Sequence, residues 1–152
     1  MLAAYPDSRV IVAHFGQIRQ PERQKLFGPE LVRYLLSTYP NLYFELSTGH
    51  PGRYYKCGNN RVVDTVIWDE DKRGRRTDTL RAAYKAMLTE HSDRLVAEFD
   101  YGPGNRNSDA FLRKRIDNIR LISRDLPDKA KHDIGYRTGW KLLTEKDWGA
   151  SD

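Results

Sequence analysis

Apolar residues are concentrated in three short runs along the chain, and each run ends in polar residues or glycine. The runs are residues 9–14 (RVIVAH), 41–46 (NLYFEL) and 94–100 (RLVAEFD). They are rich in Val, Ile, Leu, Phe and Tyr, which is typical of strands buried on both faces. The pattern predicts three short strands of a parallel sheet that helices cover.

Between and after these runs, apolar residues recur at intervals of three and four, as they do along one face of a helix. One predicted helix begins at Pro29, a residue suited to a first helical turn, and a second covers residues 80–90. A third follows Ser108 as its N-cap, and a last one follows Pro127. Strands that alternate with helices in this order favour an α/β fold with a parallel sheet.

Length and charge set the broad class of the protein. A chain of 152 residues with 39% hydrophobic residues fits one domain. The net charge is +5, but the basic blocks at 72–76 and 113–115 lie beside acidic residues. This mixture favours a solvated surface, so nucleic acid is an unlikely partner.

Cysteine usage and hydropathy bear on the compartment. Cys57 is the single cysteine, which excludes an internal disulfide and paired-cysteine zinc sites. The chain has no apolar run long enough to span a bilayer, and its first residues lack the features of a signal peptide. We therefore expect a cytoplasmic protein with no membrane partner.

Polar residues stand where the predicted strands end. His14 ends the first run, Ser47 follows the second, and Asp100 ends the third. Ligands of parallel sheets and (β/α) barrels gather at the carboxyl ends of the strands. A hydrogen-bonded core histidine and a cap for the YGPGN loop are the structural alternatives for His14 and Asp100. Their expected position at one end of one sheet favours a functional role.

Side-chain alternation sharpens this prediction. Alternate residues of a strand share one face. Polar side chains on a buried face are costly unless they are paired or bind a cation. In the first strand we expect Val10, Val12 and His14 to lie on one face. In the third strand we expect Val96, Glu98 and Asp100 to lie on one face.

Four stretches of the chain, read together, resemble a known family. They are PDSRVIVAHFG, YPNLYFELST, EHSDRLVAEFDYG and LPDKAKHDIGYRTGWKLL, and they span residues 5–143. In order and spacing they are similar to the last third of the amidohydrolase-related metal-dependent hydrolases and decarboxylases. In that family a histidine follows the sixth strand of a (β/α)8 TIM barrel, and an aspartate ends the eighth. The resemblance implies a partial TIM barrel whose three parallel strands correspond to strands six to eight.

The resemblance also implies roles for individual residues. Asp100 matches the aspartate that binds a divalent metal ion or takes a proton from metal-bound water. His14 matches the histidine that binds metal or acts as acid and base. Such a cation lowers the pKa of bound water to about 7, and zinc is the default by ligand type.

Residues near these two would contact a small-molecule substrate. Gly16 would let the backbone turn close to the pocket. Gln17 and Arg19 follow His14, and the guanidinium of Arg19 could bind a carboxylate through two hydrogen bonds. His50 follows the second strand. The alternatives are a surface residue for Arg19 and an ordinary loop residue for His50. The implied reaction is hydrolysis or decarboxylation of a carboxylate, amide, ester or lactone.

The chain departs from the family pattern in several ways, one of them Thr138 and Gly139 where an asparagine-alanine pair is common. Glu98 and Phe99 replace the usual small residues before Asp100. None of the four histidines forms the H-x-H pair of the first barrel strand, and three strands cannot close an eight-stranded barrel. We therefore expect residues 1–152 to be a single C-terminal fragment of a longer enzyme, inactive or homo-oligomeric by itself.

A rival interpretation treats the chain as a complete small α/β module. It would bind an anionic ligand or nucleic acid, with His14 and Asp100 in structural roles. Such binding should weaken steeply with salt, whereas a metal site should respond to chelators. A third interpretation is a degenerate barrel half that pairs with another chain. The basic residues of the rival interpretation are Arg73, Arg75, Arg76, Arg113 and Arg115.

Overall fold

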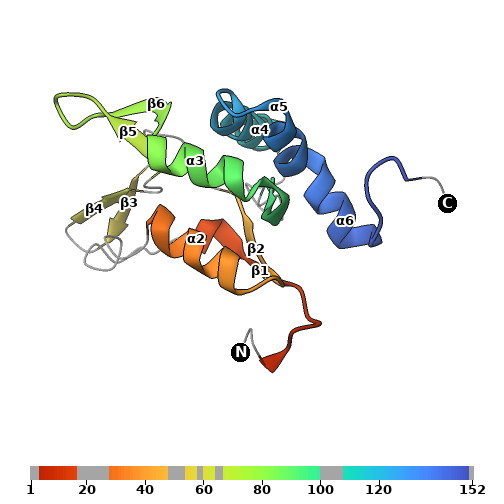
Figure 1. Cartoon of the computed structure of the whole chain (residues 1–152). Coiled ribbons are helices and arrows are strands. Elements are labelled where there is room, and N and C mark those ends of the chain that lie inside the picture. The colour runs from red at the N-terminus through yellow and green to blue at the C-terminus, as the bar shows by residue number, and fades with distance from the viewer. Residues whose placement is uncertain are drawn as a thin grey trace.

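A small parallel sheet forms the centre of the protein. The computed structural model describes residues 4–16, 28–47, 54–57, 60–63, 67–99 and 108–150. Strands β1 (Val10–Val12), β2 (Leu42–Glu45) and β7 (Leu95–Val96) are parallel and lie in the order β1-β2-β7 (Figure 1). The three predicted strands and their parallel pairing are therefore confirmed.

Two helices pack against this sheet and against each other. Helix α2 (Pro29–Thr38) begins at the predicted proline, and α3 (Ala82–Glu90) lies beside it (Figure 1). Arg33 Nε of α2 donates to Glu90 Oε2 of α3 at 2.7 Å. The apolar core beneath them includes Val32, Leu36, Leu42, Phe44, Leu46, Tyr84, Met87, Leu88 and Leu95.

The C-terminal part of the chain is helical, as predicted. Helix α4 (Asp109–Ser123) is followed by α5 (Asp128–His132), a π-helical turn (Asp133–Arg137) and α6 (Thr138–Thr144). The last three run on without a break, and α6 lies on the right-hand side of the molecule, near the C-terminus (Figure 1). None of the helices within the described ranges is both long and apolar enough to cross a bilayer.

Two antiparallel hairpins lie between β2 and α3 in the sequence. The pattern of apolar residues does not predict them. The first joins β3 (Tyr54–Cys57) to β4 (Asn60–Val63), and the second joins β5 (Trp68–Glu70) to β6 (Arg76–Leu80). Trp68 is fully buried at the base of the second hairpin, whose tip extends away from the body (Figure 1). Its base therefore belongs to the core, although most of the hairpin is polar.

The strands are shorter than predicted. A 3₁₀ turn (Ala13–Gly16) follows β1 directly, so His14 lies in a turn and the alternation of Val10 and Val12 does not extend to it. Strand β7 ends at Val96, after which Ala97 N donates to Ile134 O at 2.9 Å. The predicted continuation of this strand through Glu98 is wrong, because the backbone after Val96 bonds to the C-terminal helical segment.

Candidate functional site

The turn that carries His14 has an unusual backbone. His14 (φ 54°, ψ 33°) and Phe15 (φ 52°, ψ 36°) are both left-handed, which costs a residue other than glycine roughly 1–2 kcal/mol. These residues precede Gly16, where the sequence predicts the turn. Phe15 is 3% exposed, and its ring lies 5.6 Å from Phe44 and 6.3 Å from Tyr84. Packing of Phe15 in the core offsets the cost of the turn.

Glu45 joins the carboxyl ends of β1 and β2. Its Oε2 accepts a hydrogen bond from the backbone N–H of His14 at 3.0 Å, and its Oε1 accepts one from the backbone N–H of Ser47. Glu45 is 6% exposed, so both bonds lie out of bulk water. A buried carboxylate needs such partners, and here they come from two strand ends.

The side chains of His14 and Ser47 meet at the same place. His14 Nδ1 lies 2.7 Å from Ser47 Oγ, and Ser47 is 6% exposed. This contact occupies one ring nitrogen and leaves Nε2 for another partner. If the ring donates through Nδ1–H, Nε2 presents the lone pair that a divalent cation or a substrate proton requires.

Only part of the predicted site falls within the described ranges. Gln17, Arg19, His50 and Asp100 lie outside them, so the meeting of His14 with Asp100 stays a prediction. No three His, Cys, Asp or Glu residues come together as metal ligands in the part of the chain that the structure describes. His14 fits a nitrogen ligand, and its partner ligands would come from elsewhere.

Sequence reasoning missed the contribution of Glu45. It placed Ser47 at the end of the second strand without giving it a role, and it treated Glu45 as part of an apolar run. A carboxylate inside such a run was the available signal, because burial forces it to find hydrogen-bond donors.

The other two histidines that the structure describes contact residues close to them in sequence. His91 is the C-cap residue of α3, with Nε2 3.7 Å from Glu90 Oε1. The ring of His132 in α5 lies 5.7 Å from that of Tyr136. Each therefore contacts its own helical region, as expected for residues outside the site.

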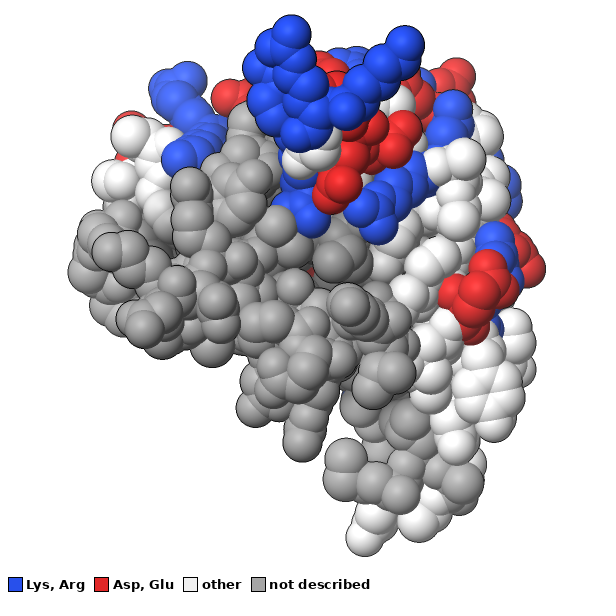
Figure 2. Space-filling view, turned by 90° about the vertical axis from the view of Figure 1, so that its left-hand side faces the viewer, with Lys and Arg blue, Asp and Glu red and all other residues white. Residues whose placement is uncertain are grey.

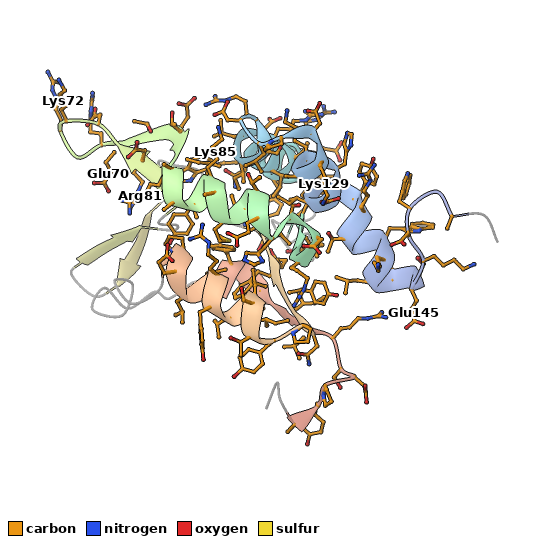
Figure 3. The ribbon with its side chains drawn as sticks, in the orientation of Figure 1. Glu70, Lys72, Arg81, Lys85, Lys129 and Glu145 are labelled. Atoms are coloured by element: carbon orange, nitrogen blue, oxygen red, sulfur yellow. The ribbon has the colours of Figure 1, made fainter. Side chains whose placement is uncertain are left out.

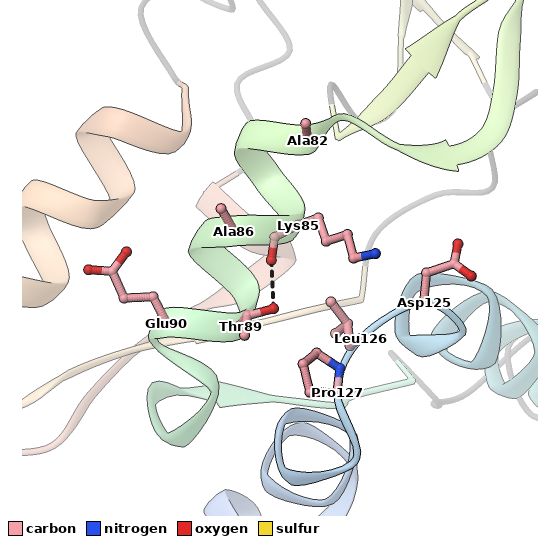
Figure 4. Close-up of a pocket in the computed structure, with 8 residues that line it drawn as sticks. All are labelled: Ala82, Lys85, Ala86, Thr89, Glu90, Asp125, Leu126 and Pro127. Atoms are coloured by element: carbon pink, nitrogen blue, oxygen red, sulfur yellow. Dashed lines mark hydrogen bonds between the residues drawn. The ribbon is translucent and has the colours of Figure 1, made fainter.

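A groove between α3 and the α4–α5 junction is a separate feature (Figure 4). Lys85 extends from α3 toward Asp125, and Leu126 and Pro127 line the groove between them. The Thr89 hydroxyl donates to Lys85 O within α3 at 2.9 Å. Neither His14 nor Ser47 lines this groove, so the groove is separate from the site that His14, Glu45 and Ser47 form.

Of the five basic residues of the rival interpretation, Arg76 and Arg115 are largely buried, whereas Arg73, Arg75 and Arg113 are exposed. Arg75 NH2 lies 2.8 Å from Asp71 Oδ2, and the side chain of Arg76 is only 7% exposed. Arg115 is 9% exposed and stacks over Phe111. On the hairpin side of the molecule, blue and red side chains are interleaved (Figure 2), and Lys72 projects from the hairpin tip (Figure 3). This surface carries mixed charge.

Comparisons with protein-family models, curated proteins and solved structures find no match to this chain. Any assignment of function therefore depends on the residues and geometry described above.

Proposed function

We propose that this chain supplies part of the active site of an amidohydrolase-like metal-dependent hydrolase or decarboxylase. Strands β1, β2 and β7 would form one arc of a (β/α)8 barrel. The proposal is supported chiefly by the link between His14 and Ser47 at the carboxyl ends of two neighbouring parallel strands. The family resemblance of residues 5–143 agrees with this location.

Each residue has a defined role in this proposal. His14 Nε2 and the Asp100 carboxylate would hold a divalent cation, with zinc as the default. The bound ion would lower the pKa of a water molecule and polarise the substrate. Arg19 would bind a substrate carboxylate, and Gln17 and His50 would complete the substrate contacts. The substrate would be a small carboxylate, amide, ester or lactone.

The test is zinc binding by the protein made from the whole reading frame that contains these residues. The protein is stripped with a chelator and titrated with Zn²⁺, and bound metal is counted by mass spectrometry. We expect stoichiometric zinc, with affinity at least about tenfold lower in His14→Ala and Asp100→Asn. His132→Gln is the matched control and should bind as the wild type does.

Activity completes this test. Zinc-dependent turnover should appear in a panel of small esters, lactones, amides and carboxylates, and the chelator should abolish it. A wild-type protein that binds no zinc, or one whose binding His14→Ala leaves unchanged, would contradict the proposal.

The rival function makes an opposite prediction. An anion-binding module would bind single-stranded or duplex DNA with an affinity that falls steeply between 50 and about 200 mM salt. The burial of Arg76 and Arg115 removes two of the five basic residues from such a surface, while Arg73, Arg75 and Arg113 stay exposed. Salt-sensitive DNA binding that Arg73→Ala reduces, in a protein that binds no zinc, would favour the rival.

A further inference from the structure

The strand-end hydrogen bonds form one connected arrangement that includes two residues without an assigned role. Glu45 accepts from the backbone of both His14 and Ser47, and the side chains of those two residues contact each other. His14 is 31 residues from Glu45 in sequence, so only the pairing of β1 with β2 brings them together. The arrangement constrains both the backbone and the ring of His14.

We propose that Glu45 and Ser47 are positioning residues that fix the orientation of the His14 ring, with the Nδ1–H donating to Ser47 Oγ. The Nε2 lone pair is then the one that a ligand would use. The use of this lone pair for a cation or a substrate proton rests on the proposed function; the position of the proton is measured independently of it.

Glu45 fixes the backbone position from which the His14 side chain extends. In a continued strand the N–H of His14 would point toward a neighbouring strand, but here the chain turns left-handed and the N–H reaches Glu45 Oε2. The same carboxylate fixes the backbone of Ser47. One buried side chain thus sets the separation of the two residues whose side chains must meet.

Ser47 determines how the ring is protonated. A hydroxyl can donate to Nδ1 or accept from it. The polarity in which the ring N–H donates is the one that leaves the Nε2 lone pair for a ligand. Ligating histidines are commonly fixed in this way, by a hydrogen bond from the nitrogen that does not bind the metal.

The experiment reads the tautomer of His14 directly. The 152-residue chain is labelled with ¹⁵N-histidine, and two-bond ¹H–¹⁵N correlations are recorded near pH 8.5, about two units above the usual histidine pKa. The chain has four histidines, so His14→Gln assigns the His14 signals. We expect the Nδ1–H pattern in the wild type and a shift toward Nε2–H, the form that free imidazole side chains prefer, in Ser47→Ala.

Control variants separate positioning from general damage. Ser8→Ala removes an exposed hydroxyl and should leave the His14 pattern unchanged. Glu45→Gln places an amide NH₂ group against one of the two backbone donors, so it should also move His14 toward Nε2–H. If Glu45→Gln unfolds, as circular dichroism would show, Ser47→Ala alone decides the result.

Each outcome has a defined meaning. A wild-type His14 with its proton on Nε2, or a pattern that Ser47→Ala does not change, overturns the inference. The Nδ1–H pattern lost in Ser47→Ala supports it, even in a protein that binds no zinc. In that case the proposed function fails while the positioning role stands.

Discussion

The ring of Phe15 lies 5.6 Å from the ring of Phe44, and this contact anchors the turn that carries His14 to the neighbouring strand. Both rings are almost fully buried. Because His14 directly precedes Phe15 in the same left-handed turn, the burial of Phe15 sets the direction in which His14 leaves β1. Core packing and site geometry are therefore coupled at adjacent residues.

Truncation of Phe15 should destabilise the protein and loosen this turn. Phe15→Ala is expected to lower the free energy of unfolding by about 3–5 kcal/mol, the usual cost of removing a buried aromatic ring. Urea unfolding followed by circular dichroism measures it. Tyr5→Ala, at a residue that is 62% exposed, is the control and should change stability by less than about 0.5 kcal/mol. Equal losses in both variants would show that Phe15 is not a core anchor.

The carboxylate of Asp133 should make stability depend on acid. Burial alone raises its pKa, but hydrogen bonds from Lys129 and Ser92 and the charge of Arg137 lower the pKa overall. A lowered folded pKa gives stability that is present above the unfolded value of about 3.9 and is lost as the pH falls through the folded value.

The measurement compares wild type with Asp133→Asn by thermal unfolding from pH 7 to pH 2.5. The wild type should be more stable at pH 7, and its advantage should shrink below about pH 4, where the carboxylate becomes protonated first in the unfolded chain and then, at lower pH, in the folded protein. An advantage that stays constant down to pH 2.5 would show that the charge of Asp133 does not contribute.

The cap of α4 can be tested with one hydroxyl. Ser108 Oγ accepts from the backbone N–H of Phe111 at 3.2 Å, as expected for an N-cap. Ser108→Ala should cost about 1 kcal/mol, while Ser108→Asp should retain most of the stability because aspartate also caps helices. Guanidinium unfolding of the three proteins decides this. A loss in Ser108→Asp as large as that in Ser108→Ala would argue against a capping role.

Two glycines should respond to alanine in opposite ways. Gly74 has φ +69° in the turn of the β5–β6 hairpin, whereas an added Cβ at Gly135, in the π-helical turn, meets no atom within 4 Å. Gly74→Ala should therefore lose roughly 1–2 kcal/mol, and Gly135→Ala should be neutral or gain about 0.4–1 kcal/mol. Differential scanning calorimetry of the wild type and of each variant measures these two changes in stability. A Gly74→Ala protein as stable as the wild type would contradict the strain at this turn.

Sequence pattern was enough to predict the main elements because their signals are local. The apolar runs mark β1, β2 and β7, and Pro29 and Ser108 mark the starts of α2 and α4. Each signal lies within the element that it identifies, since helix and strand periods are properties of consecutive residues. The parallel pairing followed from the alternation of strands with helices.

Other features were decided only by contacts between distant residues. The hairpins between β2 and α3 were missed because their strands are short; β5 and β6 are also mostly polar, and Trp68 is the one buried residue of β5. The early end of β7 was missed because Ile134, far along the chain, takes the hydrogen bond of Ala97. The alternation of side chains along a strand shows which face of the sheet a residue occupies. It does not show which distant backbone group takes the hydrogen bond of that residue.

At the candidate site, the sequence by itself determined that His14 and Ser47 stand at the carboxyl ends of neighbouring parallel strands. Only the tertiary structure decided that Glu45 binds both backbones and that the His14 ring contacts the Ser47 hydroxyl. The reason is physical: a buried carboxylate takes whichever donors the fold brings to it, and these donors arise from a turn held by the packing of Phe15.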